Sequence, residues 1–249
     1  RVEFKARLQP GRMFLVDSVQ GRIISDSEIK ESLAKAHPYQ VWLNQNLVEL
    51  DNLPLPPDLP DPADHATVLQ RQQAFGYSFE TQRTLMAPMG KNGGEALGSM
   101  GDDTPIAALS DQPQLLYSYF RQLFAQVTNP PLDGIREELV TASDVMLGTE
   151  GNLLDTLPEN CRQIRLKIPI LTNGQLARLA HVHTPGFKAQ KLSILYPIKD
   201  GWQGLEKALD DMFALADEAM EQDVNVFILS DRGVNREMAP IPALLATAG

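Results

Sequence analysis

The last third of the chain has a pattern that restricts the fold more than any other feature. Residues 192–195 and 224–229 are nearly continuous β-prone apolar runs, and residues 205–220 between them place apolar side chains on one helical face and acidic ones on the other. This order predicts a strand, an amphipathic helix and a buried strand, which form a right-handed βαβ unit with parallel strands. The predicted apolar face consists of Leu205, Ala208, Leu209, Met212, Ala216, Ala219 and Met220.

Two further segments predict β-structure. Residues 13–24 contain short apolar runs around a turn at Gly21, which favours a hairpin. Residues 164–170 alternate apolar and polar side chains, which is typical of a strand. We therefore expect a mixed α/β fold: a short hairpin and helix segment, then a barrel-like central domain with C-terminal βαβ units.

Several helices are expected before the C-terminal third. Ser25 or Asp26 can cap a helix that ends before residue 37, and Ser78 can cap one over residues 79–87. Residues 113–127 carry an apolar stripe that predicts a longer, core-facing helix. Asp133 can cap a helix over residues 134–143.

Five prolines divide the chain between residues 53 and 63. Their spacing favours an extended polyproline II conformation, which is stiff. We expect a tether over residues 51–66, between an N-terminal piece (residues 1–50) and a larger domain (residues 67–249). The prolines are Pro54, Pro56, Pro57, Pro60 and Pro62.

Composition excludes several classes of function. The formal net charge is −10, with no dense cluster of basic residues, so nucleic acid is not an expected partner. No apolar run approaches the roughly 20 residues that cross a bilayer, so no membrane is expected either. Cys161 is the only cysteine, which excludes an internal disulfide and fits a reducing compartment. We expect a cytoplasmic (bacterial) or plastid protein.

The short motifs favour structural roles, with one exception. The glycine-rich residues 90–101 lack a phosphate-binding pattern, His181 and His183 lack a third ligand at a supporting spacing, and Cys161 has no activating group nearby in sequence. A metal-dependent hydrolase using the two histidines stays open, and elemental analysis would test it.

The exception is the segment of residues 230–233, Ser-Asp-Arg-Gly. It follows a buried strand, where α/β folds place their ligands. Two interpretations of this segment stay open. Asp231 and Arg232 pair with each other at a turn, or the chain is a free-standing module that binds a small anionic ligand here.

Longer motifs occur in an order that resembles one family. They are QQAFGY (72–77), LGSMGDDTP (97–105), YFRQLFAQVTNPP (119–131), IREE (135–138) and ILSDRG (228–233). Together they resemble the central domain of the large subunit of glutamate synthase. Residues 8–17 and 38–43 resemble the end of that enzyme's glutamine amidotransferase domain. The chain starts at Arg1 without methionine, and both ends are expected to be cuts through a longer polypeptide.

The resemblance implies a structural, non-catalytic role. In this family an amidotransferase domain releases ammonia from glutamine, and a channel carries it to a barrel domain where FMN and a 3Fe-4S cluster support its condensation with 2-oxoglutarate to glutamate. The electron donor is ferredoxin or a small NAD(P)H-oxidising subunit. The central domain joins the two flanking domains and helps wall the channel.

For this chain the resemblance implies no catalytic, cofactor-binding or metal-binding residues. An amidotransferase of this class needs a cysteine at its amino terminus, and a three-iron cluster needs about three thiolates, whereas Cys161 is single and internal. We expect Thr128 and Asn129 to line the channel and Asp231 and Arg232 to lie at a domain interface.

Overall fold

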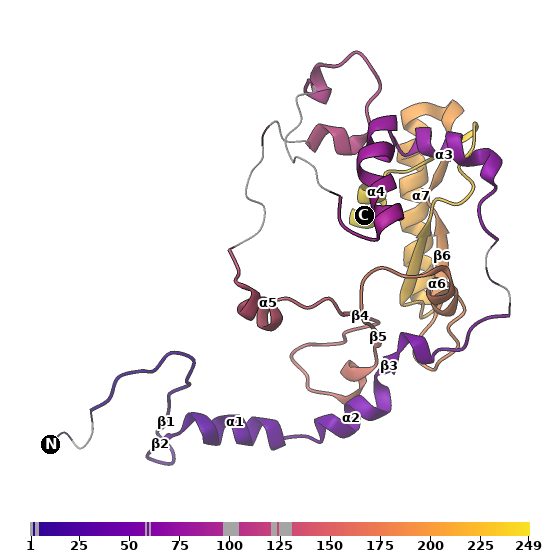
Figure 1. The fold of residues 1–249 in the computed structure, drawn as a ribbon. Helices are drawn as coiled ribbons and strands as arrows, with labels where there is room; N and C mark the ends of the chain where they lie inside the picture. Colours follow the sequence, from indigo (N-terminus) through magenta and orange to yellow (C-terminus); the bar gives the residue numbers. More distant parts are fainter. Residues whose placement is uncertain are drawn as a thin grey trace. The chain divides into compact units, whose positions relative to one another are not determined.

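The computed structural model describes residues 2, 5–57, 59, 61–96, 105–120, 124 and 131–249. The chain divides into two compact units. Figure 1 shows the helices and strands as a ribbon coloured along the sequence. The smaller unit contains residues 1–49 and 146–165, and the larger contains residues 50–145 and 166–249.

The smaller unit begins with the expected hairpin. Strands β1 (Leu15–Asp17) and β2 (Arg22–Ile24) pair antiparallel. One carboxylate oxygen of Asp17 accepts hydrogen bonds from two amides of the turn, at 2.8 and 2.9 Å. Gly21 has φ of +65°, a left-handed conformation that glycine adopts without strain. The hairpin prediction is confirmed.

Helix α1 (Asp26–Lys35) follows directly and has no buried residue. Ser25 is its N-cap, and the Ser25 side chain accepts a hydrogen bond from the Glu28 amide at 3.2 Å. Arg22 pairs with the Glu28 carboxylate at 2.6 Å, which joins the hairpin to the helix. The predicted cap and the predicted end before residue 37 are both confirmed.

The rest of the smaller unit is built on α2 (Tyr39–Asn46), which contacts the 3-10 turn Pro158–Cys161. Strand β3 (Val48–Glu49) pairs in parallel with β5 (Ile164–Leu166), and β4 (Val145–Leu147) completes the order β3-β5-β4. Ile164 is fully buried.

The C-terminal part of the larger unit contains the predicted βαβ unit, but its first strand covers residues 189–193 instead of 192–195, and Leu195 begins a separate strand. Strand β6 (Ala189–Ser193) pairs in parallel with β8 (Val226–Ser230), and α7 (Gly201–Glu221) lies between them in sequence and contacts β6. Strands β7 (Leu195–Pro197) and β9 (Met238–Pro240) form an antiparallel pair. Helix α8 (Ala243–Ala248) follows β9.

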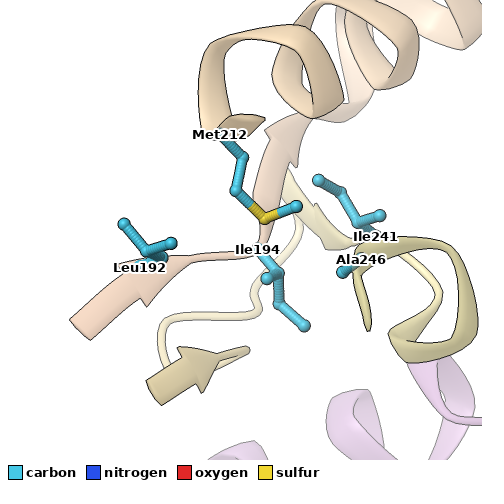
Figure 2. Close-up of a cluster of buried hydrophobic side chains, with 5 residues drawn as sticks. All are labelled: Leu192, Ile194, Met212, Ile241 and Ala246. Atoms are coloured by element: carbon cyan, nitrogen blue, oxygen red, sulfur yellow. The ribbon is translucent and has the colours of Figure 1, made fainter. Parts of the chain in front are cut away.

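The main core packs around α7. Figure 2 shows the Met212 side chain extending from the helix toward Ile194 and Ile241, with Leu192 and Ala246 completing the buried cluster. Full burial of a side chain of this size contributes about 1.5–3 kcal/mol. The predicted apolar face of α7 is confirmed except at Met220, which is 61% exposed. Met220 lies one residue from the C-terminal end of the helix, and the neighbouring Ala219 is the buried residue there.

No sheet closes into a barrel within the described ranges, where each sheet has two or three strands. The mixed α/β class is right, but the barrel-like arrangement is not confirmed. The alternating pattern of residues 164–170 forms a strand only as far as Leu166, and Ile168 and Ile170 are 52% and 76% exposed.

The middle of the larger unit is helical. Helix α3 (Val68–Ala74) is followed by a π-helical turn (Thr81–Met86) and by α4 (Ala87–Asn92). Ser78 accepts a hydrogen bond from the Thr81 amide at 3.1 Å, as expected for a capping residue. The helical backbone continues beyond its predicted end into α4, with Pro88 in the first turn of α4. Gly93, with φ of +63°, ends it.

The predicted long helix over residues 113–127 is wrong in its described part. Residues 113–115 are not helical, and Leu116–Phe120 form a 3-10 turn. Tyr119 and Phe120 are 49% and 72% exposed, so the apolar stripe does not face a core there. Residues 121–123 and 125–130 lie outside the described residues.

Helix α5 (Gly134–Val140) is confirmed, although it ends earlier than predicted. The Asp133 carboxylate caps it by accepting two amide hydrogen bonds, at 3.0 and 2.9 Å. Helix α6 (Asn173–Ala180) was not predicted. The other short turns are 3-10 helices at Leu50–Asn52, His65–Thr67, Ala107–Leu109 and Ile198–Asp200. None of the helices described is both long and apolar enough to span a membrane.

Candidate functional site at the end of strand β8

The carboxyl end of β8 carries the motif singled out in the sequence. The strand ends at Ser230, whose hydroxyl accepts a hydrogen bond from the Arg232 amide at 3.4 Å. Gly233 has φ of +107°, and a Cβ there would lie 3.2 Å from a Leu195 side-chain carbon. The conformation favours glycine at this turn, and a larger residue would also require the Leu195 methyl group to shift slightly. Val234 then returns to the interior.

A cavity of about 600 Å³ lies beside this turn, entirely within the larger unit. The size falls in the range of small-molecule sites. Its wall is formed by residues between 62 and 67, by Arg71 of α3 and the C-cap residue Phe75, by the first residue of α6 and by the turn after β8. The lining residues are Pro62, Ala63, Asp64, Thr67, Arg71, Phe75, Asn173, Asp231, Arg232, Gly233 and Val234.

The cavity wall carries two cations and two anions. The Arg71 Nε donates to the Thr67 hydroxyl at 3.1 Å, and the Arg232 Nη1 donates to the Asp61 carbonyl at 3.3 Å. The Asp64 carboxylate accepts a hydrogen bond from the Ala66 amide at 3.0 Å. Because the lining contains both positive and negative groups, the cavity can accept a small polar molecule or a polar chain segment.

The strand-end pattern predicted two of the four charged residues of this wall. It placed Asp231 and Arg232 at a carboxyl end, and both do line the cavity. It missed Asp64, Thr67 and Arg71. The sequence did contain a signal for Asp64. It is the N-cap of the 3-10 helix His65–Thr67, and Asp is a favoured N-cap residue.

The channel-lining candidates Thr128 and Asn129 lie outside the described residues, so their expected position stays a prediction.

His181 and His183 lie at the end of α6 rather than on a strand. His181 is the C-cap residue, and its Nδ1 lies 3.0 Å from the Ala177 carbonyl oxygen. Both side chains are exposed. Over the ranges that the structure describes, no group of three or more His, Cys, Asp or Glu side chains is arranged to hold a metal. Cys161 ends a 3-10 turn and is partly exposed.

Ionisable groups with shifted pKa values lie in the smaller unit. Hydrogen bonds from Lys30 and from the Met13 amide lower the pKa of Asp26. The hydrogen-bonded pair of Arg22 and Glu28 lowers the pKa of the carboxyl and raises that of the guanidinium. All three groups are at the surface, so these shifts reflect local ion pairs.

Two family models match the chain in order. Residues 1–42 match the class II glutamine amidotransferases, and residues 70–249 match the glutamate synthase central domain.

Relatives align over almost the whole chain. The large chain of the NADPH glutamate synthase of Bacillus subtilis is 44% identical over 99% of this chain. The NADH glutamate synthase of Schizosaccharomyces pombe and the chloroplastic ferredoxin-dependent glutamate synthase of Spinacia oleracea are each 41% identical over 99%. The chain spans only 16%, 12% and 15% of the lengths of these three proteins.

The central-domain match covers most of the chain, and it includes the β6-α7-β8 unit and the part of the cavity wall that follows residue 70. The chain therefore belongs to the glutamate synthase family, of which residues 70–249 represent the central domain.

Proposed function

We propose that this chain is the central connecting segment of a glutamate synthase, which converts glutamine, 2-oxoglutarate and a reductant into two glutamate molecules. It joins the amidotransferase domain to the FMN domain and forms part of the ammonia channel between them. The observation that carries the proposal is the order of the two matches, amidotransferase first and central domain second, on one continuous chain.

The residues present do not supply the chemistry of either half reaction. The single cysteine is internal, whereas an amino-terminal cysteine nucleophile uses its own α-amine as base. One thiol also does not fit a 3Fe-4S cluster, which needs about three thiolate ligands. We therefore assign FMN, the cluster and all catalytic residues to other parts of the parent enzyme, and no reaction step to this chain.

The proposed domain division follows the proline-rich segment. Residues 1–50 form the end of the amidotransferase domain and its junction, residues 51–66 the connection, and residues 67–249 the central domain. The family matches support this division, because they end at residue 42 and resume at residue 70 on either side of the prolines.

We further propose that Thr128 and Asn129 face the channel. Their hydroxyl, amide and backbone groups are uncharged, and the diproline that follows restricts the backbone. A neutral wall suits the cargo, because a carboxylate would favour protonation of ammonia to ammonium, which has no lone pair with which to attack a carbonyl.

A bulky side chain at residue 128 tests the channel. In the full-length enzyme, Thr128→Phe should release ammonia to solvent, so that more glutamine is hydrolysed per glutamate formed. The ratio is measured from initial rates of glutamine loss and 2-oxoglutarate consumption. Thr141→Phe is a matched control, because Thr141 is exposed just after α5. An unchanged ratio for Thr128→Phe would remove Thr128 and its neighbour from the channel.

The role does not depend on one electron donor. Relatives named for NADPH, NADH and ferredoxin align over the same span at 38–44% identity. We propose that the small NAD(P)H-oxidising subunit or ferredoxin acts on the parent enzyme outside this chain. Bacterial and chloroplastic relatives favour a cytoplasmic or plastid location.

The cavity at the end of β8 favours a second candidate, a module that binds a small anion through Arg71 and Arg232. Under the first proposal, Asp231 and Arg232 serve at a domain interface instead. Calorimetry of the chain with glutamine, 2-oxoglutarate, FMN and nucleotides separates the two. The connecting role predicts no tight binding, whereas binding that Arg232→Met abolishes would favour the second candidate.

A further inference from the structure

The proline-rich segment lacks most of the donors that would let it join a sheet or helix. Proline has no backbone N–H, and five of the nine residues from 54 to 62 are prolines. Its carbonyl oxygens remain acceptors, so donors from elsewhere must satisfy any that are buried. Arginine is well suited to this role, because its guanidinium carries five donors and no acceptor.

Arg178 of α6 supplies such donors at the start of the segment. Its Nη1 donates to the Asp51 carbonyl at 3.0 Å and also to the Leu53 carbonyl. Leu50 and Leu53 are each only 3% exposed, so the segment enters with two apolar side chains in the interior. One guanidinium nitrogen thus fixes the backbone on both sides of Asn52.

The cap of α6 contributes a second bond at the same end. The Gln175 Oε1 accepts hydrogen bonds from the Thr172 amide and hydroxyl at 3.0 and 3.1 Å, which completes a capping box. The Gln175 Nε2 donates to the Asp51 carboxylate at 3.0 Å. Further along, a Leu55 methyl carbon lies 3.7 Å from the place of a Cβ at Gly174.

Arg232 supplies the corresponding donor at the other end, where its Nη1 contacts the Asp61 carbonyl at 3.3 Å. The residues that follow, Pro62 to Asp64, form one wall of the cavity, and Arg232 with Gly233 forms another. The last part of the segment therefore lies against the end of β8, within the same unit as α6.

We propose that the described parts of this segment, residues 51–57 and 61–66, are the two ends of a docked strap and that Arg178 and Arg232 are the positioning residues that hold them. A strap fixed at both ends sets the direction in which the polypeptide enters the central domain, whereas a free tether would leave it variable. This goes beyond the proposed function, because the strap can be tested on the chain without any enzymatic activity.

Hydrogen exchange followed by mass spectrometry tests the two ends separately. Arg178→Met keeps the length and apolar stem of the side chain but removes the donors, so amides in residues 50–55 should exchange about tenfold faster. Arg232→Met should raise exchange in residues 61–67 and leave residues 50–55 unchanged. Arg236→Met is the matched control, since Arg236 is exposed in the same unit, and it should alter neither stretch.

Two additional observations separate positioning from general destabilisation. Amides of α7 and β8 should keep their protection in every variant, because neither arginine belongs to their core. Arg178→Lys should restore part of the protection, since an ammonium group can still donate to a carbonyl. The proposal is overturned if residues 50–55 exchange in the native chain as fast as an unstructured peptide, or if Arg178→Met exchanges like Arg236→Met.

Discussion

Helices α1 and α7 are stabilised in opposite ways. Helix α7 buries Met212 and Ala219 and packs further apolar side chains against the main core. Helix α1 has no buried residue and relies on the Ser25 cap and on ion pairs four residues apart. An isolated helix shorter than about 12–15 residues is marginal in water, so α1, with 10 residues, depends on each local bond.

The difference shows how much structure each segment of the sequence specifies by itself. The 21 residues of α7 place enough apolar side chains on one face to form a core, and the helix connects two parallel strands. The 10 residues of α1 specify only a helix, while exposed side chains such as Leu33 remain unpacked. Under the proposed connecting role, α7 belongs to the central domain, which has its own core, and α1 belongs to the end of the amidotransferase domain.

The largest predicted effect is at the centre of α7. Met212 is 4% exposed, and its replacement by alanine removes buried methylene and sulfur atoms and leaves a cavity. We expect Met212→Ala to lower the free energy of unfolding of the larger unit by about 2–5 kcal/mol. Urea unfolding monitored by circular dichroism measures the change.

Met220 provides a control on the same helix. It is 61% exposed, so Met220→Ala should change the free energy of unfolding by no more than about 0.5 kcal/mol. Equal losses for the two variants would show that α7 is not held by the core that contains Met212.

A smaller effect is expected at the cap of α1. Ser25→Ala removes the side-chain acceptor of the Glu28 amide, which costs about 1 kcal/mol of helix stability. Because α1 buries nothing, the loss should appear as faster hydrogen exchange over residues 26–35, with the urea midpoint of the larger unit unchanged. A drop in that midpoint would contradict the view that α1 is held by local bonds alone.

The smallest predicted effect is the acid sensitivity of α1. The pKa values of Asp26 and Glu28 are lowered by Lys30 and Arg22, so their ion pairs contribute fully at neutral pH. The contribution is lost as pH falls below the ordinary carboxyl pKa, about 4, through the lowered values. Hydrogen exchange over α1 at pH 3, compared with its intrinsic acid rate, should show reduced protection. Protection in Lys30→Met should already be weaker at neutral pH.

Local signals predicted from the sequence were reliable where the residues themselves decide the structure. Ser25 and Asp133 cap the predicted helices, and Gly21 takes the turn conformation. The β6-α7-β8 unit also followed from sequence, because β8 is a nearly continuous apolar run and α7 has one apolar face. The bounds of β6 did not follow, because it includes Gln190 and Lys191 and only its last two residues lie in the predicted apolar run.

Predictions from apolar periodicity were wrong where the apolar side chains are exposed instead of packed in a core. Residues 116–120 have helical spacing but form a 3-10 turn with exposed aromatic side chains, and Ile168 and Ile170 alternate without joining a strand. Periodicity states which side chains share a face, but partners far apart in sequence decide whether that face is buried.

Only two of the four charged residues of the candidate site could be predicted, for the same reason. Asp231 and Arg232 could be placed at a strand end from the local pattern, but Asp64 and Arg71 reach the same cavity from more than 150 residues earlier in the chain. The partners of Arg178 in the strap likewise lie at sequence separations of 125 and 127 residues. No local spacing rule connects such positions.

The most direct test of the central claim is a turnover assay on the purified chain. Glutamine, 2-oxoglutarate and reduced ferredoxin or NADPH are supplied, and release of ammonia and glutamate is followed alongside the flavin and iron content. The connecting role predicts no release above the blank and no bound flavin or iron. Catalytic ammonia release, or a chain that purifies with a flavin or an iron cluster, would contradict it.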